Sequence, residues 1–182
     1  MPLFDFRKLY GAELAAALRP DERLHAVGPY TEPLAGDESR LGVAGPGPDR
    51  LILGFSFLHG LLWNHHRIDR ALGGVCGVGG PDSIAVRLWR AAEDCPDNTY
   101  YAVTDQRLVL LAWRLPAEFR VVCEVPRSAV AGARRKGKPF QRGRVELRFT
   151  DGSMKAFTTG ILRTTHARAL LKALSLDRLP GR

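Results

Sequence analysis

The hydrophobic pattern is densest between residues 99 and 114, TYYAVTDQRLVLLAWR, where it predicts a hairpin that is apolar on both faces. Residues 100–104 and 107–113 have the composition of strands, and Asp105-Gln106 between them predicts the turn. A strand with one wet face alternates apolar and polar side chains, whereas 107–113 scarcely alternates. We therefore expect both faces of this hairpin to be covered by other parts of the chain.

Two apolar helices are predicted before the hairpin and are available to cover its outer face. Residues 3–18 carry leucine and aromatic side chains at helical spacing. Residues 83–93 show the same spacing and follow a capping residue, either Asp82 or Ser83. The N-terminal half of the chain is thus expected to wrap the outside of the hairpin.

The rest of the pattern predicts a series of short strands closed by a helix. Further strands are expected at 22–30, 119–125, 130–135, 145–149 and 154–158. The closing helix, 164–176, has an apolar stripe formed by Ala167, Leu170, Leu171 and Leu174. This order predicts a mainly β fold with helices (α+β), in which a strongly bent antiparallel sheet or partly open barrel is plugged at one end by the helix.

The chain length of 182 residues fits one domain with additions. Residues 1–21 are interpreted as the N-terminal helix and 22–177 as the domain, with a tail at 178–182. An insertion or elaborated first half is expected at about 31–97. Its first part, 31–50, is rich in glycine, proline and acidic residues and predicts an exposed loop.

Several short motifs resemble those of bacterial pleckstrin-homology-like (PH-like) domain proteins. YYAVTDQRLVLL, CEVPRSAV and VELRFTDGSMKAF occur in this order and are followed by the helix HARALLKAL. The resemblance covers roughly 98–176, and 22–30 would supply the first strand. It implies a seven-stranded bent barrel with a C-terminal helix, and it implies no particular ligand.

Charge is distributed unevenly along the chain, whose net charge is +8. Residues 1–96 contain ten basic and twelve acidic side chains, whereas 97–182 contain seventeen and seven. Such an asymmetry indicates an anionic partner for the C-terminal half, and solubility is the competing interpretation.

The sequence pattern favours a cytoplasmic protein, in solution or peripheral to the inner leaflet of the membrane. The first residues lack a secretion signal, and the most apolar run, 51–63, is too short for a membrane-spanning helix. Cys76, Cys95 and Cys123 lie far apart and predict reduced thiols, neither a disulfide framework nor a zinc site.

The motifs that could carry catalysis or bind a metal are better explained by structural roles. His65, His66 and Asp69 could share a metal on a helix, but no third ligand accompanies either pair. GGVCGVGGPD, 73–82, lacks the residues of a phosphate-binding loop and is interpreted as a flexible connector. GFSFL lacks the second glycine of a nucleophile elbow, and nothing orients Cys76 toward a histidine. No catalytic residue, metal or cofactor is therefore predicted.

The sharpest chemical feature is the basic segment ARRKGKPFQRGR, 133–144, between two predicted strands. In a two-residue turn about Asp151-Gly152, Arg148 would stand opposite Lys155 on the wet face, and Phe157 would oppose Glu146 there. These cations would form a ledge able to bind phosphate or carboxylate groups, unless the loop is merely solvated. The predicted anion-binding or partner-binding residues are Arg134, Arg135, Lys136, Lys138, Arg142, Arg144, Arg148 and Lys155.

The favoured functional hypothesis is a non-enzymatic PH-like module that binds a membrane headgroup or an acidic protein surface. One alternative is a structural or self-associating domain without a ligand. Another is a hydrolase or metal-dependent enzyme that uses the 51–95 region. Nucleic acid is disfavoured as a partner, because the basic segment has one aromatic residue, Phe140, and no base-stacking motif.

Overall fold

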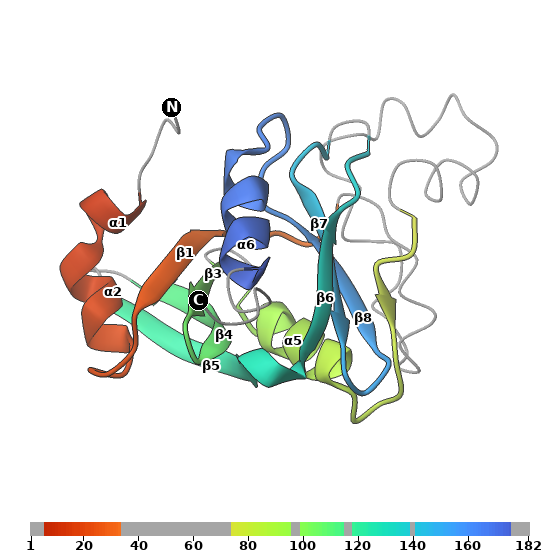
Figure 1. The fold of residues 1–182 in the computed structure, drawn as a ribbon, viewed down its shortest axis with the longest axis horizontal. Coiled ribbons are helices and arrows are strands. Elements are labelled where there is room, and N and C mark those ends of the chain that lie inside the picture. Colours follow the sequence, from red (N-terminus) through yellow and green to blue (C-terminus); the bar gives the residue numbers. More distant parts are fainter. Residues whose placement is uncertain (1–5, 34–73, 96–98, 115–117, 139–140, 176–182) are drawn as a thin grey trace, which may run out of the picture.

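The computed structural model describes residues 6–33, 74–95, 99–114, 118–138 and 141–175 (Figure 1). The fold is α+β, as the pattern of strands and helices predicts. Its elements, in chain order, are α1 (Phe6–Leu9), α2 (Gly11–Ala17), β1 (Leu24–Pro29), β2 (Gly77–Val78), α5 (Ile84–Glu93), β3 (Thr99–Thr104), β4 (Arg107–Arg114), β5 (Glu118–Pro126), the 3-10 turn η3 (Arg127–Ala129), β6 (Val130–Arg135), β7 (Arg144–Phe149), β8 (Met154–Thr158) and α6 (Thr165–Ser175).

The strands form two antiparallel sheets. The first has the order β1-β3-β4-β5 and the second the order β2-β8-β7-β6. Thr31, just after β1, forms an isolated bridge with Thr158 of β8, but in the described part of the chain the two sheets do not close into a barrel. The predicted strands are confirmed to within two residues at each end. The expected flexible connector at 73–82 is wrong in part, since β2 lies within it and pairs with β8.

The main core lies between the two sheets and is completed by α5 and α6. From α6, Leu170 and Leu174 are buried as expected, while Leu171 is half-buried at the edge of this core. The hydroxyl of the buried Tyr101 donates to the carbonyl of His166 at 2.8 Å and joins α6 to β3. Burial also raises the pKa of Tyr101, so this hydroxyl keeps its proton.

A second apolar cluster covers the outer face of the first sheet, where α1 and α2 lie (Figure 1). Val109 and Leu111 of β4 point into it, and Leu14 of α2 is 1% exposed there. Tyr10 packs edge-on against Phe119 and tilted against Trp113. The expectation that the segment 3–18 covers the hairpin is confirmed, although its described residues form two helices and not the single one predicted.

The expectation that 83–93 shares this outer position is wrong, because α5 belongs to the main core. Ser83 caps the helix by accepting from the Val86 amide at 3.4 Å. The β7–β8 connection then fixes its place: Asp151 Oδ2 accepts from the Ile84 amide at 2.8 Å, and Ser153 Oγ from the Ala85 amide at 3.2 Å. The burial of Asp151 would raise its pKa, but the hydrogen bonds that it accepts from the Ile84 amide and from the hydroxyl and amide of Ser153 lower it.

The register of β7 against β8 differs from the predicted one. Its loop has three residues, 150–152, because the Phe149 amide donates to the Ser153 carbonyl at 2.9 Å and Gly152 takes a φ of 79°. Arg148 therefore pairs with Met154, and Phe157 pairs with Val145. Phe157 is buried in the main core and does not point outward.

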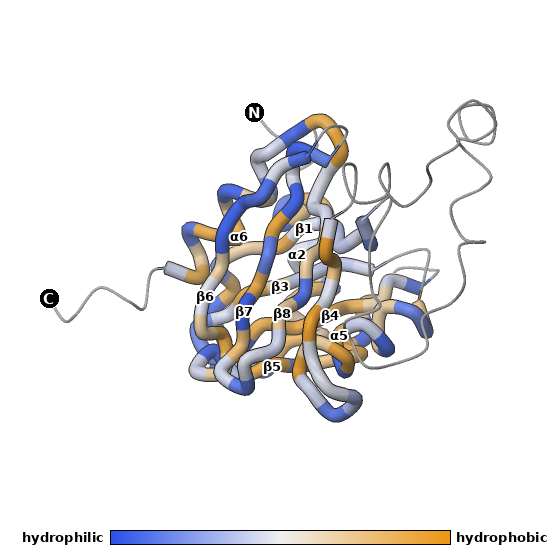
Figure 2. The backbone as a smooth tube through the Cα atoms, turned by 90° about the vertical axis from the view of Figure 1, so that its right-hand side faces the viewer, coloured by the Kyte–Doolittle hydropathy of each residue, from blue (hydrophilic) through white to orange (hydrophobic). Residues whose placement is uncertain are grey.

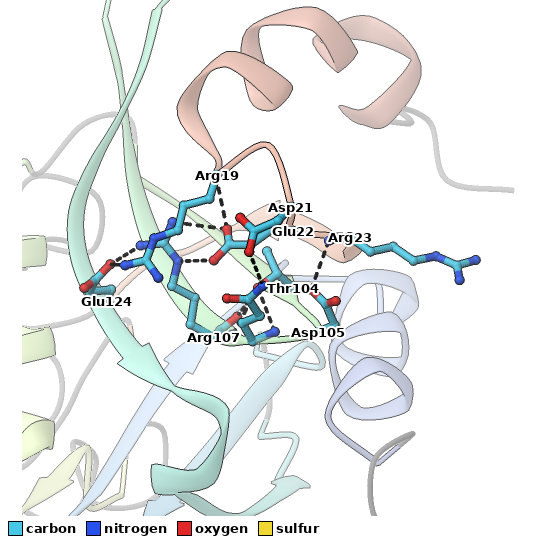
Figure 3. A network of polar contacts seen from close by, with 9 residues as sticks. Arg19, Asp21, Glu22, Arg23, Thr104, Asp105, Arg107 and Glu124 are labelled. Carbon is cyan, nitrogen blue, oxygen red and sulfur yellow. Dashed lines mark hydrogen bonds and ion pairs between the residues drawn. The ribbon is translucent and has the colours of Figure 1, made fainter. Parts of the chain in front are cut away.

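The β3–β4 turn is tied to the chain before β1 by a network of polar contacts (Figure 3). The Thr104 hydroxyl accepts from the Gln106 and Arg107 amides at 3.2 and 3.0 Å. The buried Arg107 donates through Nε and Nη2 to the two oxygens of Glu22, at 2.6 and 3.1 Å, and pairs through Nη1 with Glu124. The polar residues of the TDQR turn thus hold the sheet together.

Some expectations fall outside the described residues. These are the histidine pair of HHRID, the apolar run at 51–63, the serine of GFSFL and most of the loop at 31–50. In the described part of the chain, no three His, Cys, Asp or Glu side chains come together as a metal site. No disulfide joins Cys76, Cys95 or Cys123.

The outer cluster leads to a stability prediction. Replacing Leu14 by alanine should lower the free energy of unfolding by about 2–5 kcal/mol, because it leaves a cavity against β4 and β5. Leu9, which is 55% exposed, provides the control, and its replacement by alanine should cost less than about 0.5 kcal/mol. Chemical denaturation measures both variants. Equal losses would show that α2 is not part of the folded core.

Candidate anion-binding site

The cations of the predicted basic ledge fall into two groups, because the side chains of strand β6 point alternately to its two faces. Successive side chains of a strand point to opposite faces, so Arg134 and Lys136 lie on one side and Arg135 on the other. The two groups meet different surroundings, and their charges have different partners.

The first group gathers around one carboxylate, Glu146 of β7. Arg134 donates to Glu146 through Nη2 at 2.6 Å, Lys136 Nζ lies 3.3 Å away and Arg148 Nε 3.6 Å away. Burial alone would raise the pKa of Glu146, but the hydrogen bond from Arg134 and the charge of Lys136 lower it. The stabilisation from this charged carboxyl is therefore complete above its ordinary pKa of 4.5 and is lost as the pH falls below that value. These three cations have a partner within the protein.

The second group lines an open hollow of about 560 Å³ between the β6–β7 connection and the start of α6. Four of its lining residues are basic, and none of the described lining residues is acidic. Within the part of the chain that the structure describes, none of the four forms an ion pair. We call this feature the basic hollow; its residues are Arg135, Gly137, Lys138, Arg142, Leu162, Thr164 and Arg168.

Backbone hydrogen bonds hold the two sides of the basic hollow together. The Arg142 amide donates to the Ile161 carbonyl at 2.9 Å, and the Gly143 amide to the Gly160 carbonyl at 3.0 Å. In return, the Gly143 carbonyl accepts from the amide and the hydroxyl of Thr159, at 3.1 and 2.9 Å. The β6–β7 and β8–α6 connections therefore form one platform, at the upper end of the molecule in Figure 1. The backbone of the two connections is therefore held in place before any ligand arrives.

Two of the eight predicted residues lie outside this surface, because they are buried. Arg144 is 2% exposed, and its Nη2 donates to the Val75 carbonyl at 2.8 Å. Lys155 is fully buried, and its Nζ lies 2.7 Å from Glu32 Oε2. Lys155 pairs with Leu147, a core residue, since the three-residue loop shifts the predicted register by one. The prediction that Arg144 and Lys155 belong to an exposed ledge is wrong.

The structure adds residues that the sequence analysis did not single out. Arg168 comes from the first turns of α6, and Leu162 with Thr164 from the connection before it. A weak signal was present, since Ile161-Leu162 is an apolar pair in an otherwise polar connection. Nothing in the sequence joins that connection to residues 135–142, because the link consists of backbone hydrogen bonds.

Close packing of the platform predicts a strong effect at Gly143. A Cβ atom there would lie 2.6 Å from the Gly160 carbonyl oxygen and 2.8 Å from that of Arg163. Replacing Gly143 by alanine must separate the two connections and should lower the free energy of unfolding by about 1–3 kcal/mol. Gly132 on β6 has nothing within 4 Å of such an atom, so its replacement by alanine is the matched control and should be nearly neutral. Chemical denaturation of both variants tests the packing, and equal stabilities would contradict it.

Among the described residues, no helix combines the length and the hydrophobicity that a membrane span requires. Comparisons of the chain with protein-family models, with curated proteins and with solved structures gave no match. The candidate site therefore stands on its geometry: a preformed platform with four basic side chains around one hollow.

Proposed function

We propose that this chain is a non-enzymatic, PH-like binding module that recognises an anionic partner at the basic hollow. The PH-like part of the proposal is supported by the order of the elements. An antiparallel sheet that begins with β1 and continues through β3, β4 and β5 is followed by β6, β7 and β8 of a second sheet and then by α6. The motifs that resemble PH-like proteins lie at the turns of this order.

One observation carries the binding proposal: the cations of the hollow have no acidic partner among the described residues, whereas their neighbours Arg134 and Lys136 share Glu146. Like charges placed together repel one another, and an anion bound between them removes that repulsion. Arg135, Arg142 and Arg168 can each offer a planar pair of donors to a phosphate or carboxylate group. The hollow is open, so such contacts are screened by salt.

The proposal is tested with two soluble polyanions, a short polyphosphate chain and poly-glutamate, titrated into the protein by calorimetry at low and at high salt. At least one should bind at low salt and weaken as salt is added. Replacing Arg135 and Arg142 together by glutamate should reduce binding at least tenfold, because two donors become two repelling charges.

The matched control replaces Arg90 and Arg120 by glutamate. Both are exposed, lie on α5 and β5, and give the same change in net charge. The control should bind as the unmodified protein does. If both double variants lose binding equally, the effect is one of net charge and the site is wrong. If the unmodified protein binds neither polyanion, the chain is better described as a structural domain.

A further inference from the structure

Two large apolar side chains stand exposed at the rim of the basic hollow. Ile161 is 52% exposed and Leu162 is 70% exposed, and Leu162 also lines the hollow. Arg163 follows them directly and is exposed as well. Figure 2 shows a short hydrophobic stretch next to a hydrophilic one at this end of the molecule, above the start of α6. Together with the charged hollow beside them, these two exposed apolar side chains offer a partner an apolar contact next to a basic one.

The apolar pair is presented by a structured connection. The Ile161 carbonyl accepts from the Arg142 amide at 2.9 Å, so the backbone under the pair is attached to the β6–β7 connection. Thr164 follows at the start of α6, where its carbonyl accepts from the Arg168 amide at 2.9 Å. The two side chains are therefore held outward at a fixed place beside the four cations, at no further cost in loop entropy when a partner binds.

We propose that the anionic partner is the surface of a lipid bilayer, and that Ile161 and Leu162 insert into it while the basic hollow binds the lipid headgroups. This inference rests on the proposed function, because it names the partner of the same site. Headgroup phosphates of a bilayer lie directly above its hydrocarbon, so one flat surface offers an anion and an apolar phase side by side. The platform matches this surface: Ile161 and Leu162 protrude toward the hydrocarbon, and the basic side chains lie behind them at the level of the headgroups.

A soluble acidic protein fits this surface less well. It would have to offer carboxylates to the four cations together with an apolar pocket for two side chains that protrude. The bilayer needs no such pocket, and Arg163 next to the tip can extend to the headgroup level while its stem stays in the apolar layer. Charge complementarity and the protruding pair together favour the bilayer.

The test measures co-sedimentation with vesicles of phosphatidylcholine and phosphatidylglycerol, and with vesicles of phosphatidylcholine alone. The protein should bind the mixed vesicles and not the neutral ones. Ile161 does not line the hollow, and replacing it by serine should weaken vesicle binding about tenfold, since its apolar side chain no longer leaves water. Binding of polyphosphate should stay unchanged, which separates insertion from charge. Leu9→Ser, on α1, is the control for an exposed leucine and should change neither.

Insertion has its own readout. A Leu162→Trp variant is mixed with vesicles whose phosphatidylcholine has brominated acyl chains, which quench tryptophan that lies in the hydrocarbon. The fluorescence of the introduced tryptophan should fall on binding, relative to the unmodified protein.

Each other outcome overturns the inference in a distinguishable way. If polyphosphate binds and the mixed vesicles do not, the bilayer is the wrong partner and the anion-binding function stands. If poly-glutamate alone binds, an acidic protein is the better partner. If vesicles bind but neither the serine variant nor the brominated lipid has an effect, the apolar pair does not insert. If nothing binds, both the inference and the proposed function are wrong.

Discussion

The side chains of β4 are buried on both of its faces, and each face needs a cover of its own. Leu108 and Leu110 point into the main core, while Val109 and Leu111 point into the outer cluster. The main core is closed by the second sheet together with α5 and α6, and the outer cluster by α1 and α2. Removing water from both faces is the dominant favourable term for a hairpin of this composition. The positions of the helices and of the second sheet therefore follow from the burial of both faces of β4.

This arrangement leaves little of the first sheet for a ligand. Its outer face is occupied by helices, and its ends at the β3–β4 turn are joined through Arg107 to Glu22 and Glu124. The second sheet is different at its upper end, where two connections protrude beyond the core and are joined to each other by backbone hydrogen bonds. Among the residues that the structure describes, the four cations of the basic hollow form no ion pair, in contrast to the network at Arg107. We assign binding to the surface whose cations form no ion pair among the described residues.

The sequence was most informative where the side-chain pattern alone decides the outcome. Period-two and helical spacing located the strands and α6, and the lack of alternation at 107–113 predicted the outer cover. Errors arose where a short loop decides the register: TDGS fits a two-residue or a three-residue loop, and the choice between them moved Lys155 and Phe157 from the surface to the core. The position of α5 depends on capping by Asp151, which lies 67 residues away from Ile84. The sequence predicted Arg135, Lys138 and Arg142 as part of the site. It did not predict Arg168 and the apolar pair, because the backbone contacts that bring them there leave no pattern in the sequence.

The central claim is that binding takes place on the platform formed by the β6–β7 and β8–α6 connections. The most direct measurement is a map of backbone amide chemical shifts while polyphosphate, or lipid nanodiscs that contain phosphatidylglycerol, are added to the folded protein. The account predicts that the perturbed amides belong to residues around Arg135, Arg142 and Leu162 and to the first turn of α6. It also predicts that the amides of β3 and β4 stay unperturbed. Shifts concentrated on β5 or α5, with the platform unchanged, would contradict it.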